Sequence, residues 1–129
     1  MAFYAGGQSE NYIQKVNQGD SYSFTVGLKD DKTGELIPFE TGDILRYTVR
    51  TNYRSSDIVL QKEISVFTSD GKAEVIVLST DTDNIEVDKY VYDIELSKND
   101  GQVITIIPDS RTVCVLPTLE VCPQVSRRI

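Results

Sequence analysis

Apolar and polar residues alternate along much of this chain, and this period of two constrains the fold more than any other feature. The alternation is strict over residues 21–28 and 45–50, and over residues 90–97 only Val91 departs from it. Successive side chains of a β-strand point to opposite faces, so alternating runs of this length are typical of half-buried strands. Each of the three segments is therefore predicted to form a strand with one apolar face.

Further alternating runs lie between and after these strands. Residues 58–66 keep one parity except at Lys62, which indicates either a bulge or a lysine that extends to the rim. An Asp-Gly pair favours a hairpin into residues 73–79. The strand at 90–97 is expected to continue through short turns into QVITIIP and RTVCVLP as an antiparallel meander.

The chain as a whole predicts an all-β fold. No segment of ten or more residues has helical spacing, and one helical turn is expected from Ser79 or Thr80 to near Ile85. Seven or eight short strands, with turns about every eight to twelve residues, indicate a sandwich of two antiparallel sheets. The predicted core consists of Phe24, Val26, Leu28, Leu45, Tyr47, Val49, Val75, Val77, Tyr92, Ile94 and Leu96.

A chain of 129 residues suits one domain, and the sandwich is assigned to residues 17–116. Residues 1–16 and 117–129 are predicted to be arms, and they are too apolar to be solubilising tails. We expect the arms to add as strands to a neighbour, giving a homo-oligomer or docking onto a larger protein. The alternative is that they fold back on their own sandwich. The apolar arm residues are Phe3, Tyr4, Tyr12, Ile13, Leu119, Val121, Val125 and Ile129.

Charge and hydropathy exclude two classes of partner. The net charge of −7 opposes binding to nucleic acid, and residues 79–101 alone hold seven acidic and two basic side chains. No run approaches the roughly 20 apolar residues that cross a membrane. The N-terminus shows no secretion signal, so we expect synthesis and folding in the bacterial cytoplasm.

The residue inventory predicts no enzyme, no catalytic residue and no cofactor. Histidine is absent, which excludes catalytic triads that depend on it. Cys114 and Cys122 are too few for zinc and are interpreted as buried or half-buried reduced thiols rather than a disulfide. No glycine-rich phosphate loop follows any strand.

Two groups of acidic residues leave alternatives open. Asp93 and Glu95 share one face of a strand, as paired carboxylates of a glycosidase would, but that face is interpreted as solvent-facing. A second acidic group could supply oxygen ligands for calcium, although its spacing fails the helix-loop-helix pattern, so a solvated loop is preferred and no metal is predicted. That second group is Asp81, Asp83, Asn84, Glu86 and Asp88.

Several motifs together suggest a family. Gly19-Asp20 opens an alternating strand, Lys29-Asp30-Asp31 precedes a turn, Leu45 to Arg50 form a central strand, and Tyr90 to Leu96 form a late one. Over residues 17–116 this pattern resembles the immunoglobulin-like N-terminal domain of phage baseplate upper proteins and related tail, fibre and head modules. The resemblance implies an immunoglobulin-like sandwich without an active site that joins other virion proteins, either in a baseplate or as a separate virion accessory.

The expected function is therefore that of a non-enzymatic structural module of a phage virion. The alternative is a bacterial surface or carbohydrate-binding sandwich, which would present exposed Trp or Tyr as a stacking platform. The chain has no Trp, and most of its seven Tyr fall on core positions. An intracellular enzyme inhibitor or adaptor is a third class.

Overall fold

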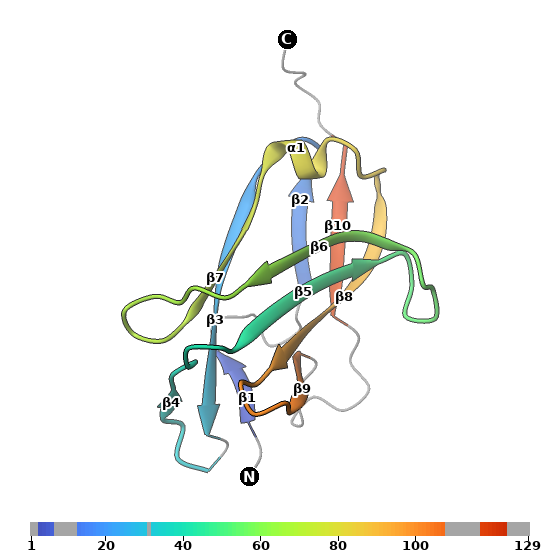
Figure 1. Cartoon of the computed structure of the whole chain (residues 1–129). Helices are drawn as coiled ribbons and strands as arrows, with labels where there is room; N and C mark the ends of the chain where they lie inside the picture. The colour runs from blue at the N-terminus through green and yellow to red at the C-terminus, as the bar shows by residue number, and fades with distance from the viewer. Residues whose placement is uncertain (1–2, 7–12, 31, 108–116, 124–129) are drawn as a thin grey trace.

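A computed structural model of the chain describes residues 3–6, 13–30, 32–107 and 117–123 (Figure 1). These residues form ten strands and one helical turn, so the all-β prediction is confirmed. In chain order the elements are β1 (Phe3–Gly6), β2 (Ile13–Asn17), β3 (Tyr22–Asp30), β4 (Leu36–Ile37), β5 (Ile44–Arg50), β6 (Ile58–Ile64), β7 (Ala73–Val77), α1 (Ser79–Thr82), β8 (Asp88–Ser97), β9 (Val103–Ile107) and β10 (Thr118–Cys122).

The strands form two sheets. In the four-stranded sheet, β3 pairs with β7 along its first half and with β1 and β4 along its second half. The six-stranded sheet has the order β2-β10-β8-β5-β6, and β9 pairs with the last residues of β8. In Figure 1, β3 and β7 run side by side, apart from β5, β6 and β8 of the other sheet.

This arrangement is an immunoglobulin-like sandwich, as predicted. The chain places β3 in one sheet and β5 and β6 in the other, returns with β7, and crosses again to β8 beside β5. That crossing order is the Greek-key connection of immunoglobulin-like folds. Two details differ from the prediction. The described residues hold ten strands rather than seven or eight, and β2 runs parallel to β10, so the larger sheet is mixed.

The segments predicted as arms contribute strands to the sandwich. β1 pairs with β3 in one sheet and β2 with β10 in the other, so the N-terminal segment contributes to both sheets. β10 lies between β2 and β8 and buries Leu119 and Val121. For these residues the observed arrangement is the alternative in which the ends fold back on their own sandwich. Tyr12, Val125 and Ile129 lie outside the described residues, as does most of the strand predicted at 111–117.

The core lies between the sheets, where the period of two predicted it. Ten of the eleven predicted core residues are buried, and Phe24 is half-buried against them. The alternation explains this result because inward and outward positions along β3, β5, β7 and β8 are fixed by the pleat. Buried hydrophobic residues outside the predicted set are Val16, Phe39, Leu60, Ala73, Ile85, Tyr90, Ile106, Leu119 and Val121.

An aromatic cluster fills the centre of the core. The ring of Tyr47 meets the rings of Phe24 and Tyr92 edge-on, with centroids 5.1 Å and 5.4 Å away. In antibody domains, a disulfide bond joins the two sheets in the core. Its second cysteine lies two residues after a tyrosine whose hydroxyl binds the backbone upstream. Here Tyr92 stands two residues after Tyr90, so an aromatic ring occupies that position.

Side-chain hydrogen bonds hold the segment that connects β7 with β8. The Tyr90 hydroxyl donates to the carbonyl oxygen of Glu86 at 2.6 Å, which is the tyrosine corner of such sandwiches. The Thr82 hydroxyl donates to the carbonyl of Asp20 at 2.7 Å. Helix α1 is shorter than predicted, and its first turn is capped by the carboxylate of Asp81, which accepts the Leu78 N–H at 2.8 Å.

Candidate functional site

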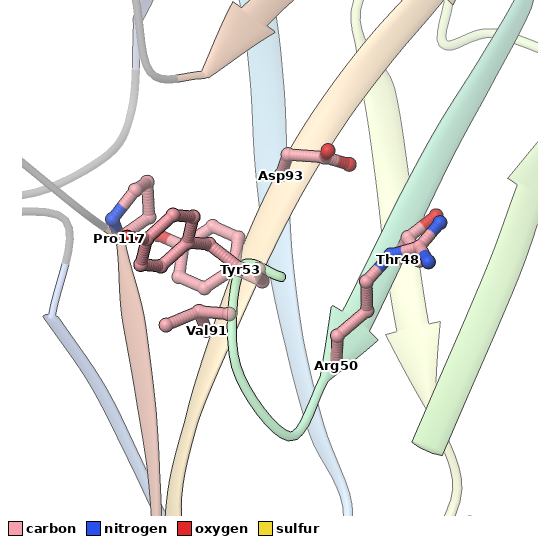
Figure 2. A pocket seen from close by; sticks show the side chains of 7 residues that line it. Thr48, Arg50, Tyr53, Val91, Asp93 and Pro117 are labelled. Atoms are coloured by element: carbon pink, nitrogen blue, oxygen red, sulfur yellow. The ribbon is translucent and has the colours of Figure 1, made fainter. Parts of the chain in front are cut away.

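The candidate site is a pocket on the outer face of the six-stranded sheet. Its volume is about 150 Å³. Figure 2 shows Thr48 and Arg50 on one side, Tyr53, Val91 and Pro117 on the other, and Asp93 projecting from β8 between them. Strands β5 and β8, the loop after β5 and the residue before β10 therefore contribute to one site.

Strand register brings the polar side chains of the pocket together. Thr48 lies opposite Asp93, and Arg50 lies opposite Val91, in the antiparallel pairing of β5 with β8. These positions alternate with core residues of the same strands, so they face outward. Directly opposed residues on neighbouring strands have Cβ atoms about 4.5–5.5 Å apart, close enough for their side chains to interact. The site is thus built on two adjacent, paired strands of the six-stranded sheet.

Asp93 is the acid most affected by its surroundings in the pocket. Its side chain is half-buried, and the pKa of its carboxyl is raised above the usual value, first by burial and then by the nearby charge of Glu95. The positive charge of Arg50 acts in the opposite direction but does not cancel these effects. Within the described part of the chain, the Asp93 carboxylate makes no hydrogen bond or ion pair.

The other polar groups of the pocket have partners. An Arg50 guanidinium nitrogen donates to the carbonyl of Ser55 at 3.2 Å, which fastens the loop after β5. The Thr48 hydroxyl accepts a hydrogen bond from Gln61 at 3.0 Å. Tyr53 is 60 % exposed, and the guanidinium carbon of Arg54 lies 5.2 Å from the centre of its ring. Asp93 is therefore the pocket's one carboxylate, and the charge of Arg50 offsets the effects of burial and of Glu95 on it only in part.

Neighbouring charges on the same face form ion pairs. Arg46 lies 2.9 Å from Glu63 and 3.5 Å from Glu95. Asp93 and Glu95 lie along one strand rather than facing each other across a cleft, and Glu95 forms an ion pair with Arg46. This geometry offers no pair of carboxylates that would hold a sugar between them for hydrolysis.

In the acidic loop considered for calcium, the carboxylate of Asp81 already has partners within the protein. Asp81 lies 2.7 Å from the Lys62 ammonium, and it also accepts the Leu78 N–H. The hydrogen bond from Lys62 is the main cause of the lowered pKa of Asp81. Asp83, Asn84, Glu86 and Asp88 are exposed. In the part of the chain that the structure covers, no three acidic or cysteine side chains are grouped to hold a metal ion.

The position of Lys62 also explains why the alternation of apolar residues along β6 is interrupted at this residue. Its side chain is 28 % exposed and extends to the rim of the sandwich, where it meets Asp81. The register irregularity of this strand lies elsewhere, opposite Val49 and Arg50. The lysine that reaches the rim, rather than a bulge at Lys62, accounts for the pattern. Such an inward-pointing charge also protects an edge strand from pairing with another chain.

The described cysteine does not line the pocket. Cys122 is a half-buried free thiol at the end of β10. Cys114 lies outside the described residues. Among the helices of the described ranges, none has the length and apolar character to cross a membrane.

Comparisons with known proteins find similarity in structure but not in sequence. No model of a protein family matches the sequence. No curated protein matches it either. A solved structure of murine CRIg is similar at 8% identity and a TM-score of 0.44, covering 96% of this chain and 99% of that one. At this level the likeness has no bearing on the site or its ligand.

Proposed function

We propose that the chain is a non-enzymatic module that binds other proteins through the outer face of its six-stranded sheet, as a structural component of a phage virion. The tail, baseplate and head are the candidate locations. The observation that carries the binding role is the pocket at Asp93, where a half-buried carboxylate lies beside exposed aromatic surface. Pockets with mostly apolar walls and a few placed polar groups are typical of recognition sites.

Two observations support a virion component over a secreted domain. The first is the resemblance of residues 17–116 to phage baseplate and tail modules. The second is the core, in which Tyr47 packs between Phe24 and Tyr92 and receives a hydrogen bond from the opposite sheet. Such a core needs no oxidation, so it can form in a reducing cytoplasm before assembly.

A carbohydrate-binding role has less support. Sugar platforms need exposed aromatic faces. Of the aromatic side chains whose exposure the structure describes, Tyr53 alone is mostly exposed, and the Arg54 guanidinium lies over its ring. This single ring suits a partner side chain better than an extended glycan.

Mass spectrometry of phage particles purified by density gradient tests the virion role. We expect this chain to follow the major capsid protein across the gradient at a constant ratio. If the chain stays in the soluble lysate or at the bacterial envelope and is absent from intact particles, the virion role is wrong.

Photo-crosslinking in assembled particles tests the binding face. A photoreactive phenylalanine analogue at position 53 should crosslink to another virion protein. The matched control places the same analogue at Ile76, which is 52% exposed on the four-stranded sheet. Crosslinks from position 76 but not from position 53 would show that the partner uses the opposite face.

A further inference from the structure

The chemistry of the pocket limits what can occupy it. Tyr53, Val91 and Pro117 line one side, and Asp93 adds a carboxylate between them and Arg50 (Figure 2). An occupant must therefore combine an apolar stem with a charged or polar end. The long side chains of lysine and arginine have this form, because their methylene groups bury well while the charged head finds a partner.

The sign of the charge follows from the groups that face Asp93. Glu95 adds negative charge beside it, and this effect is larger than the opposite effect of Arg50, whose guanidinium donates to the Ser55 carbonyl. Arg46 is engaged with two glutamates. An incoming cation would compensate a carboxylate that burial and like charge now disfavour, whereas an incoming anion would be attracted by Arg50 but repelled by both acids. The net charge of −7 attracts the same kind of partner.

The volume limits the occupant to one side chain. A cavity of about 150 Å³ is large enough for a molecule of the size of benzene. It is too small for a helix or a folded segment. The pocket is therefore suited to a single anchor residue, of the kind that carries much of the binding energy in protein interfaces.

We infer that the pocket receives one basic side chain, arginine or lysine, of the partner protein, with its stem against Tyr53 and Val91 and its cation at Asp93. This inference rests on the proposed protein-binding function and names the chemistry of that partner. Arginine fits both parts of the site, because its planar guanidinium pairs with carboxylates and stacks on aromatic rings.

A titration followed by amide NMR on the full chain tests the inference. The probes are N-acetyl-arginine-N-methylamide, the lysine equivalent, and the citrulline equivalent, which has the shape of arginine without its charge. We expect the basic probes to shift the amide signals of residues 53, 91 and 93, and the citrulline probe to bind at least about tenfold more weakly.

Two substitutions separate the Asp93 charge from general charge effects. Asp93→Asn keeps the shape of the side chain and should weaken binding of the basic probes by about tenfold or more. Glu74→Gln is the matched control, since Glu74 is exposed on β7 of the opposite sheet, and binding should be unchanged. Tyr53→Ala should weaken binding through loss of the aromatic surface.

Three results would overturn the inference. Equal binding of the citrulline probe would remove the role of charge. Equal binding by Asp93→Asn would place the cation elsewhere, and stronger binding of a glutamate probe, lost in Arg50→Gln, would reverse the sign of the site. If one of these results is found while position 53 still crosslinks within particles, the inference about the basic side chain fails but the proposed protein-binding function stands. Failure of the inference can therefore be distinguished from failure of the proposed function.

Discussion

The hydroxyl oxygens of Tyr22 and Tyr47 lie 2.9 Å apart and join the two sheets of the sandwich. The Tyr47 hydroxyl also donates to the side-chain oxygen of Gln14 at 2.8 Å, so Tyr22 must donate to Tyr47. The hydrogen bonds therefore run in one direction, from β3 through β5 to β2. This relay and the aromatic cluster together hold the centre of the fold.

Removing the central hydroxyl should cost stability. Tyr47→Phe leaves the half-buried side chains of Tyr22 and Gln14 without their shared partner, so we expect a loss of about 1–3 kcal/mol in the free energy of unfolding. Urea denaturation measures it, and Tyr53→Phe, at an exposed ring, is the control with no expected change. In a double-mutant cycle, purely additive effects of Tyr22→Phe and Tyr47→Phe would contradict the relay.

Alkaline pH should destabilise the protein through the same pair. Burial raises the pKa of Tyr22 to about 12 and raises that of Tyr47 well above its usual value. The unfolded chain releases these protons near pH 10, so the stabilisation is present below pH 10 and is lost as the pH rises toward 12. Urea midpoints measured between pH 9 and 12 should fall, and they should fall less in Tyr22→Phe. An equal fall in both proteins would remove Tyr22 as a cause.

The last described strand should stabilise the fold as strongly as a central one. Leu119 and Ile94 are both fully buried, so Leu119→Ala and Ile94→Ala should each cost about 2–5 kcal/mol. Val103, which is 61% exposed, supplies the control Val103→Ala with little expected loss. A negligible effect of Leu119→Ala in urea denaturation would mean that this segment is a detachable arm.

Local periodicity predicted the fold class because alternation directly reports which side chains meet the core. It placed Val26, Tyr47 and Ile94 inside, and all three are fully buried. It did not include β2 and β10, because each is only five residues long, β2 does not alternate, and both strands gain their partners from distant parts of the chain. Strand pairing between the two ends of a chain leaves no local signal in the sequence.

The candidate site was not predictable by the same means. Alternation placed Asp93 on the outward face, which is correct, but solvent exposure was inferred from it. The structure shows that Val91 and the loop carrying Tyr53 build a pocket there and half-bury the carboxylate. Burial of an outward position depends on loops and neighbouring strands, so residue type and parity cannot reveal it.

Calcium should not stabilise the protein. Lys62 already supplies a positive charge to Asp81, and the neighbouring acidic residues of the loop are exposed. We expect the melting temperature to stay constant when calcium is raised to the millimolar range. A rise of several degrees that is abolished by Asp81→Asn and Asp83→Asn would show instead that the loop binds calcium.

We expect the ionised carboxylate of Asp93 to destabilise the folded protein at neutral pH. Its pKa is raised in the folded state by burial and by Glu95, so the ionised form is less favourable there than in the unfolded chain. Asp93→Asn removes that charge while keeping the side-chain shape, and it should therefore raise the urea midpoint at pH 7. A carboxylate held at a cost to the fold is expected where a binding site needs its charge.

The pH dependence separates this explanation from a change in packing. When the pH falls below the pKa of Asp93 in both the folded and the unfolded state, the carboxyl is neutral in both, and its cost disappears. The gain from Asp93→Asn should therefore shrink toward zero near pH 3, whereas a gain from improved packing would persist. Glu74→Gln should show no gain at either pH, because that side chain is exposed. If Asp93→Asn lowers stability at pH 7, attraction between Asp93 and Arg50 outweighs burial, and the pocket holds a satisfied pair with no need of a basic ligand.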